Sequence, residues 1–168
     1  MIDKSSVADR LELYRIGDDG TWNLELQTEV NLPWWKKVGK ALGFYKCIDD
    51  ALTDYAVQDF ATYIHDKYGY ASCGTDGTDG DVYTYTDLKT PVMTRVLCTK
   101  AYATTYTTND TVVYTAITTA TNDYTLTEFG IHDALTSGNM GARQTSCTWD
   151  VVNGETFGMI WRIVVSRG

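Results

Sequence analysis

The sequence has almost no proline and no long apolar run. Only two prolines occur in 168 residues, so extended proline-rich linkers are not expected. No stretch approaches the roughly 18 consecutive apolar residues of a membrane-spanning helix. The sequence shows no charged stretch followed by an apolar stretch, so a secretory signal is not expected. We therefore expect no membrane partner, and we expect the chain to be made in the cytoplasm.

Histidine is scarce and cysteine is widely spaced, which argues against several kinds of site. His65 and His132 have no second histidine or cysteine close by in the sequence, so a zinc site is not expected. We expect His65 to be a partly exposed surface group. No C-x-x-C pair occurs among the four cysteines, which are Cys47, Cys73, Cys98 and Cys147. We expect four buried free thiols, with two disulfides as the alternative, and neither a metal nor a cofactor.

Basic residues are in the minority and form no stripe. The chain has 14 Lys and Arg against 22 Asp and Glu, which gives a net charge of -8 and a pI near 4.6. Such a surface repels phosphate backbones, so we expect no nucleic-acid partner. We interpret the acidity as a solubility feature, and binding of a basic partner is the alternative interpretation.

Residues that favour strands are abundant. The chain has 12 tyrosines, and threonines crowd residues 84–127; both types suit a pleated, half-buried surface. With 43% hydrophobic residues, a chain of this length can bury the core of one domain. Alternating apolar residues over 111–120 and 157–165 predict strands. We predict a mainly β protein: a jelly-roll-like β-sandwich with one amphipathic helix and an N-terminal β-hairpin extension.

Residues 11–30 predict the hairpin, because a turn cluster at 17–20 separates two apolar stretches. In the second stretch Trp22, Leu24 and Leu26 alternate with polar residues. Period-two alternation predicts a strand with one half-buried apolar face.

Two adjacent tryptophans, Trp34 and Trp35, follow the hairpin. Because exposed tryptophan is enriched at protein interfaces, we predict both as interface residues. Packing of both under a loop is the alternative. We assign residues 1–44 to an N-terminal hairpin and docking extension, and residues 45–168 to the β-sandwich.

One amphipathic helix is predicted over residues 50–67. The apolar stripe that repeats at helical spacing consists of Leu52, Ala56, Phe60 and Ile64. Asp49 or Asp50 can cap the N-terminus, and Lys67 suits the last turn because a cation is favoured there. We expect the stripe to belong to the core.

The C-terminal stretch predicts a closing pair of strands. Residues 147–151 and 157–165 flank an Asn-Gly turn at 153–154. Apolar side chains occur on both faces of the last strand, which predicts a central strand or an edge covered by another subunit. Trp161 in this strand is a third predicted interface residue.

The glycine-rich stretch 74–81 is the segment that looks most like a ligand loop. A phosphate loop opens a helix and carries a lysine, whereas the residues after this stretch are strand-like. Its aspartates suit calcium, but Gly80 stands where the fifth ligand of an EF-hand belongs. We interpret the stretch as an acidic turn.

Enzymatic activity is not expected. A hydrolase would have to use Cys147 or Ser146 with His132 and Asp133, or Glu128 with Asp150. The chain has no G-x-S-x-G nucleophile elbow, and nothing singles out that carboxylate pair. We predict no catalytic residue.

Glu128 lies among apolar neighbours in a predicted strand. A carboxylate buried there must be paired or hydrogen-bonded. Arg143 and Arg95 are the candidate partners, and a bidentate pair would fix the register of the strands. We therefore predict a structural salt bridge.

Several short blocks follow one another between residues 45 and 167. After the helix and the glycine stretch come 85–88 (YTDL), 109–114 (NDTVVY), 126–134 (LTEFGIHDA), 137–143 (SGNMGAR) and 159–166 (MIWRIVVS). In this order the blocks resemble a module common in tail-fibre and related structural proteins of tailed viruses.

The resemblance implies a structural component of a tailed-virus particle, foremost a tail or tail-fibre subunit in a symmetric oligomer such as a trimer. A capsid decoration or head-fibre protein and a head–tail connector are the alternatives within this class. A carbohydrate-binding β-sandwich module is the alternative from another class. The implied partners are other copies of the chain, other virion proteins and a host-surface glycan. The implied location is the virion, after assembly in the host cytoplasm.

Overall fold

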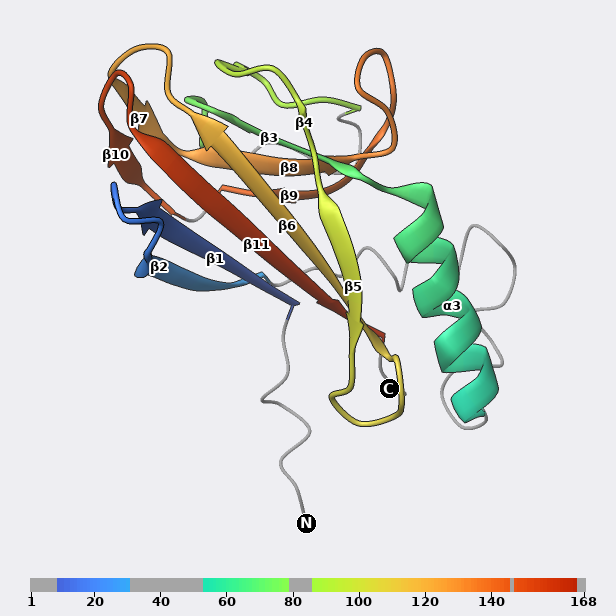
Figure 1. Cartoon of the computed structure of the whole chain (residues 1–168). Coiled ribbons are helices and arrows are strands. Elements are labelled where there is room, and N and C mark those ends of the chain that lie inside the picture. The colour runs from blue at the N-terminus through green and yellow to red at the C-terminus, as the bar shows by residue number, and fades with distance from the viewer. Residues whose placement is uncertain (1–8, 31–52, 79–85, 146, 166–168) are drawn as a thin grey trace.

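The computed structural model in Figure 1 describes residues 9–30, 53–78, 86–145 and 147–165. These residues are mainly β, with one helix and antiparallel sheets. In chain order the elements are β1 (Asp9–Ile16), β2 (Trp22–Val30), α3 (Asp54–Lys67), β3 (Tyr70–Gly74), β4 (Val96–Leu97), β5 (Thr99–Ala103), β6 (Thr111–Thr119), β7 (Tyr124–Leu126), β8 (Glu128–His132), β9 (Met140–Gln144), β10 (Trp149–Val151) and β11 (Thr156–Val164).

Two main sheets pack in a sandwich-like arrangement. The larger sheet has the order β2-β1-β11-β6-β5, the smaller has the order β4-β3-β8-β9, and β10 pairs with β7 in a short third sheet. One cluster of buried apolar residues joins them, with Leu13, Tyr114 and Trp161 from the larger sheet and Phe129 and Ile131 from the smaller. The predicted mainly β, sandwich-like class is confirmed.

The predicted N-terminal hairpin is present, but a bulge changes which way its second strand faces. The pairing passes from Leu13–Leu26 to Tyr14–Leu24, so β2 contributes one residue more than β1. Leu26 consequently packs against the core, whereas Leu24 is 51% exposed and Trp22 is 37% exposed. The prediction of one buried apolar face along β2 was wrong. The bulge puts Trp22 and Leu24 on the opposite face of the sheet from Leu26.

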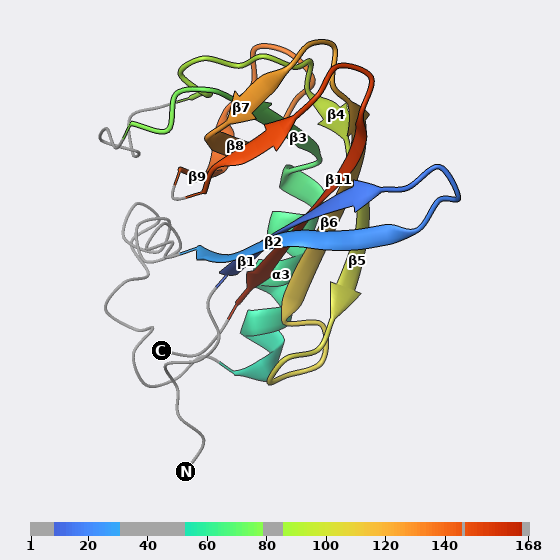
Figure 2. The ribbon, with the colours of Figure 1, turned by 90° about the vertical axis from the view of Figure 1, so that its left-hand side faces the viewer.

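The hairpin belongs to the larger sheet. β1 lies between β2 and β11 and pairs with β11 from Arg10 to Arg15 (Figure 2). Leu11 and Leu13 of β1 are fully buried in the common core. Residues 9–30 therefore share one core with the second half of the chain. The proposed boundary after residue 44 falls outside the described residues.

The helix begins at Asp54, and its N-cap is Thr53, whose hydroxyl accepts a hydrogen bond from the Ala56 N–H at 3.3 Å. The suggested caps at residues 49 and 50 lie outside the described residues. The buried positions of α3 are Val57, Ala61 and Ile64. Of the predicted stripe, Leu52 lies outside the described residues, Ile64 is buried as expected, and the prediction was wrong for Ala56 and Phe60, which are only partly buried because the helix turns the side of Val57 and Ala61 toward the core.

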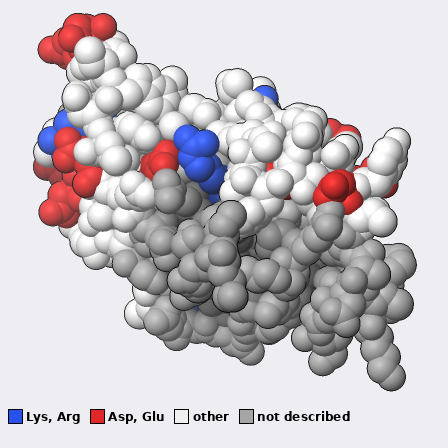
Figure 3. Space-filling view, turned by 90° about the horizontal axis from the view of Figure 1, so that it is seen from below, with Lys and Arg blue, Asp and Glu red and all other residues white. Residues whose placement is uncertain are grey.

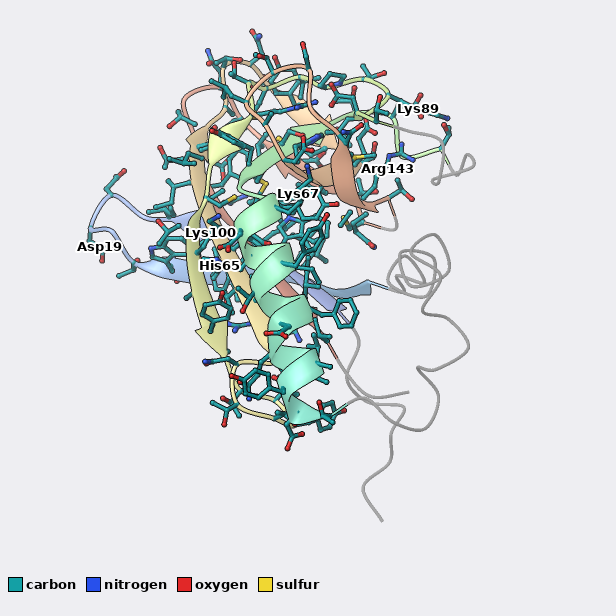
Figure 4. The ribbon with its side chains drawn as sticks, turned by 90° about the vertical axis from the view of Figure 1, so that its right-hand side faces the viewer. Asp19, His65, Lys67, Lys89, Lys100 and Arg143 are labelled. Atoms are coloured by element: carbon teal, nitrogen blue, oxygen red, sulfur yellow. The ribbon has the colours of Figure 1, made fainter. Side chains whose placement is uncertain are left out.

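The larger sheet holds the C-terminal end of α3. The Tyr114 hydroxyl on β6 donates to the Ile64 carbonyl at 2.6 Å, and the Lys100 ammonium on β5 donates to the carbonyls of His65 at 2.6 Å and Tyr68 at 3.2 Å. Carbonyls at a helix C-terminus often lack partners within the helix, so Lys100 supplies donors there, while Tyr114 adds a second donor to the Ile64 carbonyl, which also accepts from the Tyr68 N–H at 3.1 Å. Figure 4 shows Lys100 and His65 side by side at this contact.

The predicted closing pair of C-terminal strands was wrong. β10 pairs with β7, and β11 lies between β1 and β6. β6 and β11 are both nine residues long and pair along their whole length, which three-residue β10 cannot match. The Asn-Gly turn is real, with Gly154 at a φ of 85°, but it leads from one sheet to another.

The last strand is central, as one of the two sequence interpretations proposed. Trp161 on β11 pairs with Leu11 on one side and Tyr114 on the other, and its side chain is 0% exposed. A side chain inside the core cannot contact another subunit. The prediction of Trp161 as an interface residue was therefore wrong.

Candidate functional site

The side of the four-stranded sheet that faces away from the core is polar. Successive side chains of a strand point to opposite sides, so Phe129 and Ile131 of β8 join the core while Glu128 and His132 lie on the other side. All four side chains are fully buried, Phe129 and Ile131 in the core and Glu128 and His132 beneath segment 86–95. The polar layer, as we name it, comprises Ser72, Glu128, His132 and Arg143 with segment 86–95.

Glu128 is the most heavily bonded group of the polar layer. Its Oε2 accepts from Arg143 Nη2 at 2.8 Å, from Arg143 Nε at 3.1 Å and from the Lys89 N–H at 3.0 Å. Its Oε1 accepts from the Thr90 N–H at 2.7 Å. Arg143 also donates to the Asp76 carbonyl at 2.9 Å. The predicted salt bridge to Arg143 is present, and it ties two loops to the sheet.

A glycine lets the loop approach this carboxylate. A Cβ on Gly74 would lie 2.5 Å from Glu128 Oε1, so any larger residue would push the carboxylate away. Figure 4 shows that Arg143 and Lys89 lie on the same side of the molecule. The glycine stretch of the sequence thus serves close packing at this position.

Arg95, the other predicted partner, does not contact Glu128. Its Nη2 lies 2.8 Å from Asp87 Oδ2, and its Nη1 donates to the Ala134 carbonyl at 2.8 Å. The prediction for Arg95 was wrong, because Glu128 begins β8 whereas Ala134, to which Arg95 donates, follows the other end of that strand. Arg95 instead links this segment to the loop after β8.

A second buried contact in the polar layer joins β3 and β8. Ser72 Oγ lies 2.7 Å from His132 Nε2, and Asp87 Oδ1 lies 3.9 Å from His132 Nδ1. Burial, and after it the charge of Arg95, lowers the pKa of His132 to about 4, while Asp87 and Asp133 act in the opposite direction. The imidazole is therefore neutral at pH 7.

The order serine, histidine, aspartate resembles that of a hydrolase triad, but the exposure is reversed. Ser72 is 2% exposed, whereas the Asp87 side chain is 49% exposed. In a working triad the nucleophile meets the substrate and the carboxylate is buried. Leu88 also covers this spot, since its Cδ2 would lie 3.0 Å from a Cβ on Gly130. We therefore interpret the Ser72–His132 contact as a hydrogen bond that links strands β3 and β8.

The described structure does not bring together the residues that the sequence analysis considered for a hydrolase. Cys147 is buried, and burial raises the pKa of its thiol to about 12, so it carries no thiolate at neutral pH. Asp133 bonds to Lys67 at 3.0 Å. Asp150 accepts from the Thr125 hydroxyl at 2.6 Å at the surface, apart from buried Glu128. Ser146 lies outside the described residues.

The described cysteines carry free thiols. Cys73, Cys98 and Cys147 are buried and not disulfide-bonded, which confirms the expectation for these three. Cys47 lies outside the described residues. The expectation for His65 is confirmed as well, since its side chain is 21% exposed and stacks on Tyr102 with ring centroids 4.5 Å apart.

The described part of the acidic stretch forms a turn. Asp76 accepts from the Thr78 N–H at 3.0 Å and from the Thr78 hydroxyl, which also receives a bond from Lys89 Nζ at 2.7 Å. Within the described residues, no group of three or more His, Cys, Asp or Glu is placed to hold a metal ion. Residues 79–85 lie outside the described residues.

Asp110 is a buried carboxylate that organises a turn and that was not predicted from the sequence. Its carboxylate accepts from the N–H groups of Thr105, Tyr106 and Thr107 and from the Thr111 hydroxyl. Burial alone would raise its pKa, but these bonds together hold the pKa below the ordinary value. The Asn-Asp pair at 109–110 was the available signal, since these residues favour turns.

Charged side chains form no continuous basic region on the face shown in Figure 3. Figure 3 shows acidic and basic side chains in small, separate groups on the face it presents. Of the predicted interface residues, Trp34 and Trp35 lie outside the described residues. No helix among those described is long and apolar enough to cross a membrane.

Comparisons with known proteins add no relative. No family model matches the chain, and neither a curated protein nor a solved structure matches it.

Proposed function

We propose that the chain is a structural component of a tailed-virus particle, foremost a tail or tail-fibre subunit in a symmetric oligomer. A capsid decoration or head-fibre protein and a head–tail connector are the alternatives. Its partners would be other copies of the chain and other virion proteins, and its location the virion, after assembly in the host cytoplasm.

The observation that carries this proposal is the buried ion pair between Glu128 and Arg143 in the polar layer. Glu128 and Arg143 come from two of the sequence blocks that resemble the tail-fibre module, and both side chains are 0% exposed. Hydrogen bonds join them to each other and to backbone groups of Lys89, Thr90 and Asp76. These bonds position loops. This arrangement supports a rigid scaffold without enzymatic activity.

We also propose that the sandwich is jelly-roll-like. In support, strands far apart in the sequence are neighbours: β1 pairs with β11, and β3 pairs with β8. Such long-range pairing is typical of Greek-key and jelly-roll sheets. An experimental structure that traces the whole chain, including residues 31–52 that connect β2 to α3 in the sequence, tests this topology.

The oligomer is tested by light scattering on a sizing column, with electron microscopy of the same fraction. We expect a mass near three times 18.8 kDa and rotationally symmetric particles. A chain that stays monomeric at all concentrations contradicts the proposal of a self-assembling subunit. It would favour a stand-alone binding module instead.

A further inference from the structure

We infer that the outer face of the larger sheet carries a binding site for a neutral sugar ring, with Trp22 as the stacking surface. The aromatic platform, as we name it, consists of Trp22 on β2, Tyr14 on β1 and Gly158 on β11. None of these residues contributes to the polar layer. The inference does not rest on the proposed virion role.

The indole of Trp22 lies across the sheet and is seated on a glycine. A Cβ on Gly158 would lie 2.8 Å from Cη2 and 3.1 Å from Cε3 of Trp22, so the ring occupies the space of the missing side chain. β1 separates β2 from β11, and Gly158 pairs with Tyr14. The indole therefore reaches over β1 from the edge strand. The bulge in β2 places Trp22 on this outer face.

Neighbouring side chains hold the ring in position. Tyr14 meets Trp22 edge to face, with ring centroids 5.5 Å apart and planes at 64°. The Tyr14 hydroxyl donates to Glu12 Oε2 at 3.0 Å, and Arg162 Nε lies 3.6 Å from the same oxygen. Trp22 nevertheless remains 37% exposed. A supported ring that is open to solvent suits stacking, because little conformational freedom is lost when a ligand binds.

The charges around the aromatic platform favour a neutral ligand. Glu12 is paired with Arg162, so these two charges balance each other. The exposed acids near the platform are Asp18 and Asp19 in the hairpin turn and Glu25 on β2. They repel an anionic ligand. The C–H groups on one face of a sugar ring carry partial positive charge and match the negative face of an indole.

The exposed apolar area fits a sugar ring better than a protein. An aromatic side chain offers roughly 150–250 Å², so the exposed 37% of Trp22 is below about 100 Å². Leu24, which is 51% exposed, and Ile117, which pairs with Gly158 and is 49% exposed, each add an area of the same order. A standard protein interface buries roughly 800 Å² on each partner. The hairpin turn at Asp19 projects from the body of the sheet (Figure 4).

The test is a printed array of neutral, sialylated and sulfated oligosaccharides, followed by calorimetric titration of the strongest neutral ligand. Three variants are compared with the parent chain. Trp22→Ala removes the ring, and Gly158→Ala displaces it while keeping it in the sequence. Tyr55→Ala is the matched control, because Tyr55 is an aromatic residue that is 76% exposed on α3. Circular dichroism and thermal melting identify any variant that fails to fold.

We expect binding to neutral glycans that weakens about tenfold or more in Trp22→Ala and Gly158→Ala and is unchanged in Tyr55→Ala. If no neutral glycan binds, or if binding survives in folded Trp22→Ala, the inference is overturned. Preference for acidic glycans, or for a lysine-rich peptide printed beside them, also overturns it. Failure here leaves the oligomer proposal untouched, because the mass of the particle is measured separately.

Discussion

The hydroxyl of Ser72 lies 2.7 Å from Nε2 of His132, and neither side chain reaches solvent. This contact joins the central strands of the smaller sheet on its polar side. Burial and the charge of Arg95 both disfavour the protonated ring, so the folded state favours the neutral form of His132. The polar layer is consequently sensitive to acid.

His132 should make the stability of the protein depend on pH. Its pKa is about 4 in the folded chain, against about 6.5 when unfolded. As the pH falls below 6.5 the unfolded chain takes up the proton first, so stability is full above this pH and falls as the pH approaches 4. The loss amounts to roughly 3 kcal/mol at most. Urea unfolding at several pH values measures it.

The matched variants for this prediction are His132→Gln and His65→Gln. The first should flatten the dependence between pH 6.5 and 4, because the buried titrating group is gone. The second is the control, because His65 lies on α3, outside the polar layer, and its side chain is 21% exposed. Equal slopes in parent and His132→Gln would show that another group is responsible.

Glu128→Ala should destabilise the fold strongly. The change leaves the Arg143 charge buried with its main partner removed, and breaking such a pair costs about 3–5 kcal/mol. Urea unfolding gives the change in free energy. Asp59→Ala, on the exposed face of α3, is the control and should stay within about 0.5 kcal/mol. A small effect at Glu128 would mean that the pair contributes little to holding the loops.

A double-mutant cycle isolates the pair itself. Glu128→Ala, Arg143→Ala and the double variant should give a coupling energy above about 1 kcal/mol, since contacting residues in one network couple by 0.5–3 kcal/mol. Additive effects would locate the stabilisation in the backbone bonds to Lys89 and Thr90 instead.

The buried thiols should be unreactive in the folded protein. Burial raises the pKa of Cys73, Cys98 and Cys147 to about 12, so thiolate is scarce even at pH 8. In a Cys47→Ser variant, Ellman's reagent should label no thiol rapidly until urea is added, and then three. Rapid labelling without urea would contradict the described packing.

The virion proposal makes its own prediction for the N-terminal segment. If Trp34 and Trp35 lie at a subunit interface, replacing both by alanine should lower the particle mass toward 18.8 kDa while the chain stays folded. Tyr55→Ala serves as the control for loss of an exposed aromatic residue. An unchanged mass in the double variant would remove these tryptophans from the interface.

Local patterns in the sequence located most elements but not their partners. The hairpin and the strands at β6 and β11 follow from alternation and turn residues, and these depend on neighbours in the chain. The pairing of β10 with β7 and the contact between Ser72 and His132 join residues far apart. Periodicity contains no information on such pairs. The bulge in β2 was missed because the apolar residues still alternate in the sequence. Only the face of the sheet to which Trp22 and Leu24 point has changed.

The candidate site was partly predictable for a similar reason. Glu128 stood out because an acid among apolar residues needs a partner, which is a property of one position. Choosing Arg143 over Arg95 required knowing that β9 pairs with β8. Asp110 gave only a turn signal, since three of its four partners are backbone groups that any sequence provides.

Because β11 lies between β1 and β6, the larger sheet can form only after residues 156–164 have been synthesised. Until residues 156–164 emerge, β1 and β6 have no strand between them, and the largest sheet stays open along two apolar margins. The last of the described strands is thus the one that closes the larger sheet. A chain truncated before residue 156 would expose both margins to other nascent chains, a setting that promotes aggregation.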